Sequence, residues 1–149
     1  MYNMGIAYQY GRGVERDIKQ AVAWFERAAE LGLVESMDAL AWAYSTSPEL
    51  AVRSGTEAVR WAKVAVERKT SSKTLATLAA AHAEAGEYRK AVLAIDRAVE
   101  HLKREVDGGN MVLNDYDFFG LLRESGRTDE VFHLLERREY YANGLPTRE

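Results

Sequence analysis

The sequence contains no cysteine and only two prolines, Pro48 and Pro146, among 149 residues. Without cysteine, the chain cannot form a disulfide framework, a thiolate metal site or a thiol nucleophile. Because proline interrupts helices, its scarcity leaves long stretches in which helices can continue unbroken. The missing cysteines do not by themselves indicate a cellular compartment.

Long apolar runs and a strong excess of one charge are also missing. No apolar run approaches the roughly 20 residues that a membrane-spanning helix needs. The N-terminus lacks the basic and apolar segments of a signal peptide, which favours the cytoplasm without establishing it. The 20 Lys and Arg residues nearly balance the 23 Asp and Glu residues, for a formal net charge of −3. We therefore expect no general attraction to nucleic acid or anionic membranes.

Four segments of the chain resemble one another. They begin at Ala21, Ala58, Ala91 and Val131, and successive starts lie roughly 33 to 40 residues apart, around the period of paired-helix repeats. In the first three segments a second Ala follows two helical turns later on the same face, where its small side chain lets a neighbouring helix approach closely. Larger side chains between these positions are expected to fill the space between helices. These are Trp24, Phe25, Trp61, Ile95 and Leu135.

A further helix is predicted before each of these segments. In the third repeat Leu75, Leu78, Ala79 and His82 follow the i, i+3, i+4, i+7 spacing of one helix face. Gly86 comes next and suits a left-handed helix end. The pattern therefore predicts an antiparallel pair of helices joined by a short turn.

The remaining turns complete the repeat pattern. Pro48 ends the helix before Ala58, and a longer loop runs through Gly55, while Gly126 provides the turn of the fourth repeat. The segment 107–110, Asp-Gly-Gly-Asn, is the clearest linker. We predict one all-α domain over residues 1–149, a solenoid without strands, built from about four helix–turn–helix repeats. The repeats are placed at approximately 1–32, 35–68, 72–104 and 111–142.

Two related repeat families resemble these segments. The third repeat resembles a tetratricopeptide repeat at Leu75, Leu78, Ala79, His82, Gly86, Tyr88, Ala91, Ile95 and Ala98. The first resembles a Sel1-like repeat at Met4, Gly5, Tyr8, Gly11, Gly13, Val14, Asp17, Ala21, Trp24, Ala28, Ala29 and Gly32. The ending from Tyr140 to Glu149 is similar to tails that close some bacterial tetratricopeptide modules. The resemblance implies a right-handed α–α superhelix with the first helix of each pair on the concave face, without a cofactor or a catalytic role.

The resemblance also implies a surface that binds a protein or peptide partner. Carrying the family's concave positions onto this chain gives Tyr2, Asn3, Ile6, Gln9, Tyr10, Asp38, Trp42, Thr46, Lys73, Thr77, Glu84, Tyr116, Asp117, Arg123 and Glu124. The set of Lys, Asn and Arg that clamps a terminal carboxylate in some family members is largely missing. For Trp42 two interpretations stay open, an anchor for a ligand side chain or packing against the neighbouring repeat.

Other functions have weaker support. The N-terminal end should expose Ile6 and Tyr8, which allows self-association into a homodimer, or contact with further repeats of a longer protein. The Gly11-Arg-Gly13 segment is interpreted as a turn rather than a phosphate loop, since no strand precedes it. His82, His101 and His133 lack the partners of a metal site. Arg137 and Arg138, between Glu136 and Glu139, are interpreted as a solvated helix face. We expect no catalytic, cofactor or metal site and no nucleic-acid partner.

Overall fold

The computed structural model describes residues 1–108 and 123–145, which contain seven complete helices and no strand. The predicted all-α class is confirmed. The helices are α1 (Tyr2–Tyr10), α2 (Ile18–Glu30), α3 (Val34–Thr46), α4 (Gly55–Arg68), α5 (Ser72–Glu84), α6 (Tyr88–Asp107) and α8 (Thr128–Ala142). None of them is both long and apolar enough to cross a membrane.

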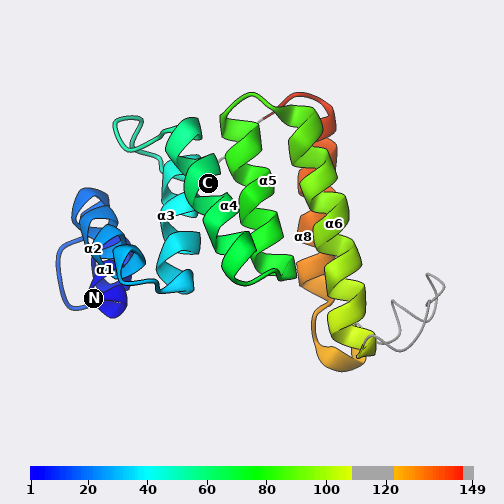
Figure 1. Cartoon of the computed structure of the whole chain (residues 1–149), viewed down its shortest axis with the longest axis horizontal. Coiled ribbons are helices and arrows are strands. Elements are labelled where there is room, and N and C mark those ends of the chain that lie inside the picture. The colour runs from blue at the N-terminus through cyan, green and yellow to red at the C-terminus, as the bar shows by residue number, and fades with distance from the viewer. Residues whose placement is uncertain (109–122, 146–149) are drawn as a thin grey trace.

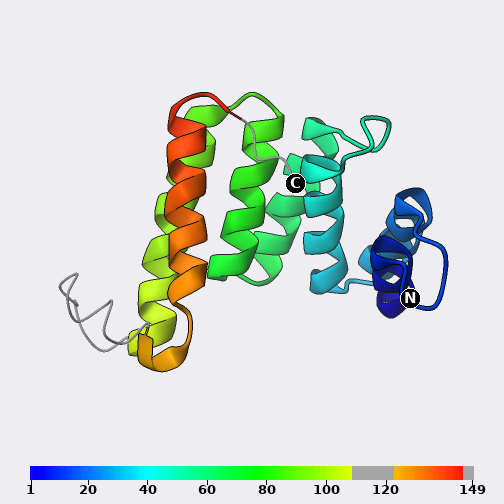
Figure 2. The ribbon, with the colours of Figure 1, turned by 180° about the vertical axis from the view of Figure 1, so that it is seen from behind.

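The helices pair into hairpins that stack along one axis. The pairs α1/α2, α3/α4 and α5/α6 follow one another from one end of the molecule to the other (Figure 1). The second helices, α4 and α6, lie toward the viewer in Figure 1, and α3 and α8 lie toward the viewer when the molecule is turned round (Figure 2). Each helix packs on the next, and α3 also packs on α5, as expected for stacked repeats. The predicted solenoid is therefore confirmed over these three pairs.

Short polar side chains define where the helices begin. The Ser54 side chain accepts a hydrogen bond from the backbone N–H of Glu57 at 3.3 Å, and Ser71 forms a capping box with Thr74. These bonds satisfy backbone donors that a helix start leaves unpaired. At the other end of α5, Gly86 has φ 77°, the left-handed conformation predicted from the sequence.

The predicted small residues form the centre of the core. Ala21, Ala58 and Ala91 are at most 1% exposed, and the second Ala of each segment is also buried. A methyl group at these sites lets the paired helices approach closely, and larger residues fill the rest of the interior. The core thus follows the seven-residue alanine spacing of the sequence.

The large residues between the alanines have different environments. Phe25 and Ile95 are fully buried, and Trp61 packs against both core clusters. Trp24 is only half-buried and lies at the surface with the guanidinium of Arg27 5.1 Å from its ring centroid. Leu135 is 38% exposed, so its predicted role in filling the space between helices was wrong.

Helix α8 runs antiparallel to α6. Three contacts follow α8 along its length. Arg127 contacts Glu105 at its beginning, Arg138 contacts Asp96 at 2.6 Å, and Gly144 lies beside Tyr88 just after its end. Figure 2 shows α8 on the face of the molecule that α3 also occupies. Helix α8 was predicted as the second helix of the fourth repeat. It packs on α6 at the position where the first helix of a next pair would lie.

A polar network fixes the beginning of α8. Glu105 accepts hydrogen bonds from the Ser72 backbone N–H at 3.0 Å and from Arg127 at 2.8 Å, which joins α5, α6 and α8. Partial burial raises the pKa of Glu105, but the hydrogen bonds from Ser72 and Arg127 lower it by more, so that the pKa lies below its ordinary value. Glu105 is therefore held in its ionised form at neutral pH.

Candidate partner-binding groove

A cavity of about 300 Å³ lies where α1, α3, α5 and α8 meet. We call this cavity the groove. Its lining residues are Tyr2, Ile6, Gln9, Tyr10, Asp38, Ala39, Trp42, Lys73, Ala76, Thr77 and Arg137. Eight of them were predicted from the sequence, and they come from the first helices of three successive repeats. The stacking of the hairpins thus gathers side chains that are far apart in the chain.

An ion pair lies in the wall of the groove. Asp38 is 4% exposed, and its Oδ2 lies 3.1 Å from Nζ of Lys73, whose side chain is largely exposed. Oδ1 of Asp38 is buried without a hydrogen-bond partner in the described part of the chain. Burial lowers the pKa of Lys73, but the charge and hydrogen bond of Asp38 offset this effect, so that its pKa is raised. The ammonium group stays charged and is available at the groove surface.

Trp42 is one of three aromatic residues that line the groove, with Tyr2 and Tyr10. It is half-buried, and the guanidinium of Arg137 lies 4.8 Å from its ring centroid. This distance is within the range of a cation–π interaction, which is worth about 0.5–1 kcal/mol at exposed sites. Trp42 therefore has a contact with α8 and a surface that lines the cavity.

A second cavity of about 230 Å³ adjoins the groove. Gln9, Tyr10 and Trp42 line both cavities. Thr46 lines only the second cavity, and its hydroxyl donates to the Trp42 carbonyl oxygen at 2.9 Å. Trp42 thus lies between two adjoining cavities. It is accessible to a ligand, as an anchor would be, and it also packs against another helix of the chain, as a packing residue would.

Four predicted residues lie away from the groove, in addition to Thr46. Asn3 is exposed and lines a cavity at the N-terminal end, with Met1 and Leu31 among its neighbours. Glu84 is half-buried near the end of α5, and Arg123 and Glu124 are exposed helical residues. None of these lines the groove. Two further predicted residues, Tyr116 and Asp117, lie outside the described residues.

Three groove residues were missed by sequence reasoning. Ala39 and Ala76 are adjacent in sequence to predicted groove residues, so their helical positions could have indicated them. Arg137 had no such signal. It was interpreted as part of a solvated face, but the antiparallel packing of α8 turns it toward Trp42. Its role depends on contacts between elements distant in sequence.

The histidines have separate environments. His82 is 6% exposed, and its Nδ1 lies 2.6 Å from Oε2 of Glu87. His101 is half-buried on α6, and His133 is exposed on α8. Within residues 1–108 and 123–145, no group of three or more His, Asp or Glu side chains is placed to hold a metal ion.

Stacked helical hairpins with a lined groove define a helical repeat protein. Within this class, residues 1–33 match the family model of the Sel1 repeat, which confirms the resemblance to Sel1-like repeats. Sel1 repeats are generally protein-interaction modules and are typically not enzymes. No curated protein and no solved structure matches the chain.

Proposed function

We propose that this protein is a non-catalytic scaffold that binds a peptide segment of a partner protein in the groove. The observation that supports this proposal is the convergence of α1, α3 and α5 on one cavity lined by Trp42. Sel1 repeats generally act in protein interactions, which agrees with such a role.

The groove offers two kinds of contact to a peptide. Ile6, Tyr10 and Trp42 provide apolar surface for a large side chain, and Ala39 and Ala76 leave room for the peptide backbone. Aromatic side chains in concave walls are frequent centres of binding energy. We therefore assign Trp42 the main contact.

Charged groups add orientation to this apolar surface. Lys73 presents its ammonium group at the wall while Asp38 holds it in place. Arg137 covers part of the Trp42 ring and must share that ring with a bound side chain. Raising the salt concentration should therefore weaken peptide binding less than removing the Trp42 side chain does.

Peptide display on the parent protein, followed by affinity measurement on the variants Trp42→Ala and Trp24→Ala, tests the proposal. Trp24 is a matched control, since it is also half-buried beneath an arginine but does not line the groove. Selected peptides should bind Trp42→Ala more weakly by about 2 kcal/mol or more. Their affinity for Trp24→Ala should stay unchanged. Selected peptides that bind both variants like the parent would refute a groove site.

Self-association is a second candidate function, supported by apolar side chains at the N-terminal end. Met1, Leu31 and Leu33 are 54%, 72% and 39% exposed, and they line a cavity of about 400 Å³. The sequence had predicted exposed Ile6 and Tyr8 here, but both are half-buried and pack against the core. Light scattering at rising concentration should show a dimer that Leu31→Glu returns to monomer, while Leu50→Glu, at another exposed leucine, has no effect. A monomer at all concentrations would exclude this candidate.

A further inference from the structure

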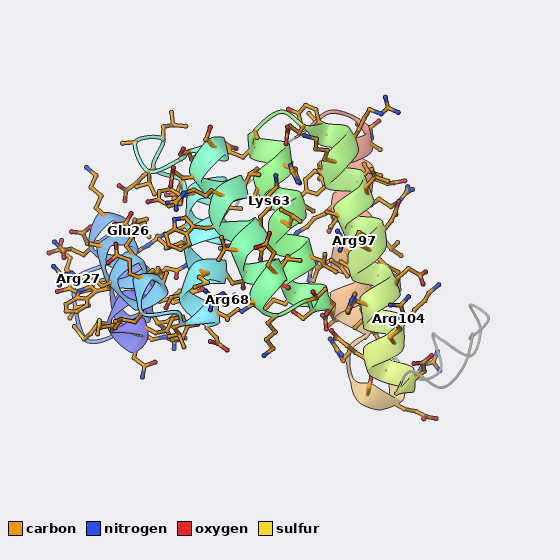
Figure 3. All side chains as sticks on the ribbon, in the orientation of Figure 1. Glu26, Arg27, Lys63, Arg68, Arg97 and Arg104 are labelled. Carbon is orange, nitrogen blue, oxygen red and sulfur yellow. The ribbon has the colours of Figure 1, made fainter. Side chains whose placement is uncertain are left out.

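A further hollow lies on the other face of the molecule, between α5 and α6. Its volume is about 690 Å³, and we call it the outer groove. Leu78, Ala94 and His82 are buried and form its floor. Figure 3 shows Arg97 and Arg104 on the exposed side of α6, on the face turned away from α8. The outer groove is therefore distinct from the groove that Trp42 lines.

Cations follow the rim of the outer groove at a regular interval. Lys90, Arg97 and Arg104 line it and are seven residues apart on α6. Seven residues correspond to two turns, about 10.5 Å along the helix axis. The three side chains therefore form a straight row on one face of α6. His101 lines the same hollow and adds a further nitrogen donor.

The carboxylates of α6 are already paired with other residues. Asp96 and Glu100 line the outer groove together with the cations. Asp96 contacts Arg138 of α8 at 2.6 Å, and Glu105, outside the outer groove, contacts Arg127 at 2.8 Å. Glu100 Oε1 lies 3.7 Å from Nζ of Lys103. The acidic groups of this helix are thus largely neutralised within the molecule.

Two of the three cations in the row have no such partner. Lys90 pairs with Glu87 at 2.6 Å, whereas Arg97 and Arg104 form no ion pair with any described residue. Three cations and two carboxylates line the outer groove, and both carboxylates are paired with cations outside it. This edge is therefore positive, although the whole chain has a net charge of −3. A partner of complementary charge must offer two negative groups about 10.5 Å apart.

An apolar side chain lies between Lys90 and Arg97 on the same face of α6. Leu93 lines the outer groove and is 63% exposed, although exposure of a leucine costs free energy unless a partner covers it. Together with the buried floor of Leu78 and Ala94, it calls for a ligand with apolar as well as acidic groups. A nucleic acid offers closely spaced phosphates and no matching apolar side chain, so a peptide fits this surface better.

We propose that the outer groove binds an acidic amphipathic helix of a partner protein. Two carboxylates two turns apart on that helix contact Arg97 and Arg104, and an apolar residue one turn beyond the carboxylate at Arg97 packs against Leu93. This site goes beyond the proposed function of the groove, because it lies on the other face and uses none of the same residues.

A designed peptide provides the probe. It is a fluorescein-labelled helix of Ala, Glu and Leu with Glu at seven-residue intervals and Leu between them. The matched probe has Lys in place of every Glu, and a labelled single-stranded DNA serves as the nucleic-acid probe. Fluorescence polarisation should show binding of the acidic helix in preference to both others, and weakening of this binding as salt rises.

Charge reversal tests whether the binding site is the outer groove. Arg97→Glu with Arg104→Glu should weaken binding of the acidic helix at least about tenfold, because repulsion replaces attraction. Arg68→Glu with Arg89→Glu is the control, since it makes the same change of net charge at exposed arginines outside the outer groove. Its affinity should stay within about twofold of the parent. Far-UV circular dichroism confirms that each variant is folded.

Further outcomes separate this proposal from the function of the first groove. Trp42→Ala should bind the acidic helix as tightly as the parent does, whether or not Trp42 contributes to peptide binding in the first groove. Equal binding of the acidic and basic helices overturns the proposal. Tighter binding of the DNA, equal weakening by the two double variants, or no binding of the acidic helix to the parent overturns it as well.

Discussion

The guanidinium of Arg137 lies 4.8 Å from the centroid of the Trp42 ring, which brings the last described helix against the middle of the solenoid. Arg137 belongs to α8 and Trp42 to α3, and both line the groove between α1 and α5. Trp42 is therefore covered in part by its own chain, and in part by whatever enters the groove. Its mixed environment leads to the first prediction.

Trp42→Ala should lower the free energy of unfolding by about 1–2 kcal/mol, because only part of the side chain is buried. A fully buried aromatic residue should cost more, and Phe25, which is 0% exposed, is the reference. Phe25→Ala should lose about 3–5 kcal/mol. Urea unfolding of both variants checks the difference. An equal loss would mean that Trp42 is chiefly a packing residue between repeats.

The pair formed by Asp38 and Lys73 should show energetic coupling. Lys73→Met leaves the buried carboxylate of Asp38 without its ion-pair partner, so it should destabilise the protein by about 1–3 kcal/mol. Asp38→Asn removes the charge that needs the partner, and Lys73→Met should then have a smaller effect. A double-mutant cycle should give a coupling of at least about 0.5 kcal/mol. Additive effects would show that Lys73 does not stabilise Asp38.

Ala91→Leu should destabilise the third hairpin. Ala91 is 0% exposed, so the larger side chain must push α5 and α6 apart, at a cost of about 1–3 kcal/mol. Ala142→Leu, at an exposed position of α8, makes the same change without this contact and should stay within about 0.5 kcal/mol of the parent. Thermal melts compare the two variants. Similar melting temperatures would be incompatible with close packing at Ala91.

Gly55→Ala should destabilise although alanine is the better helix former. A Cβ atom at Gly55 would lie 2.7 Å from Cα of Ala85, so that the beginning of α4 and the end of α5 would have to separate. We expect a loss of about 1–3 kcal/mol. Thr56→Ala, one residue later and exposed, is the control and should change stability little. A stabilised Gly55→Ala variant, in chemical denaturation, would show that the two helix ends move apart easily.

Acid should weaken the junction of α5, α6 and α8 through Glu105. The folded-state pKa of Glu105 is depressed, mainly by hydrogen bonds from Ser72 and Arg127 that outweigh partial burial. Its stabilisation is therefore complete above the unfolded-state pKa of about 4.3, and is lost as the pH falls through the folded-state pKa. Glu105→Gln should reduce the slope of stability against pH in the acid range. Glu139→Gln, at an exposed carboxylate of α8, should leave more of the slope in place.

Features that depend on residues near one another in sequence were predicted well. The alanine spacing identified Ala21, Ala58 and Ala91 as core positions, because helix periodicity alone places them on the packed face. Gly86 was predicted as a left-handed helix end for a similarly local reason. The first helices, once located, also gave most of the groove residues, since the stacking of hairpins repeats from pair to pair.

Features that depend on a particular neighbour were not predictable. Trp24 and Trp61 occupy equivalent positions, yet only Trp61 packs against both core clusters, whereas Trp24 lies at the surface beside Arg27. Leu135 is exposed because α8 packs on α6 through another side. Arg137 became a groove residue through the same antiparallel packing.

The contact of Arg137 with Trp42 also connects α8 to a hairpin other than the one on which it mainly packs. The curvature of a solenoid depends on the angle between successive hairpins. Because α8 is joined to α6 by Asp96 and Arg138, and to α3 by Trp42, it connects the two successive hairpins α3/α4 and α5/α6. A change in the angle between these two hairpins would strain the contacts that α8 makes with them. A peptide that takes Arg137's place on Trp42 would therefore remove one of the contacts that hold these hairpins together, as well as fill the groove.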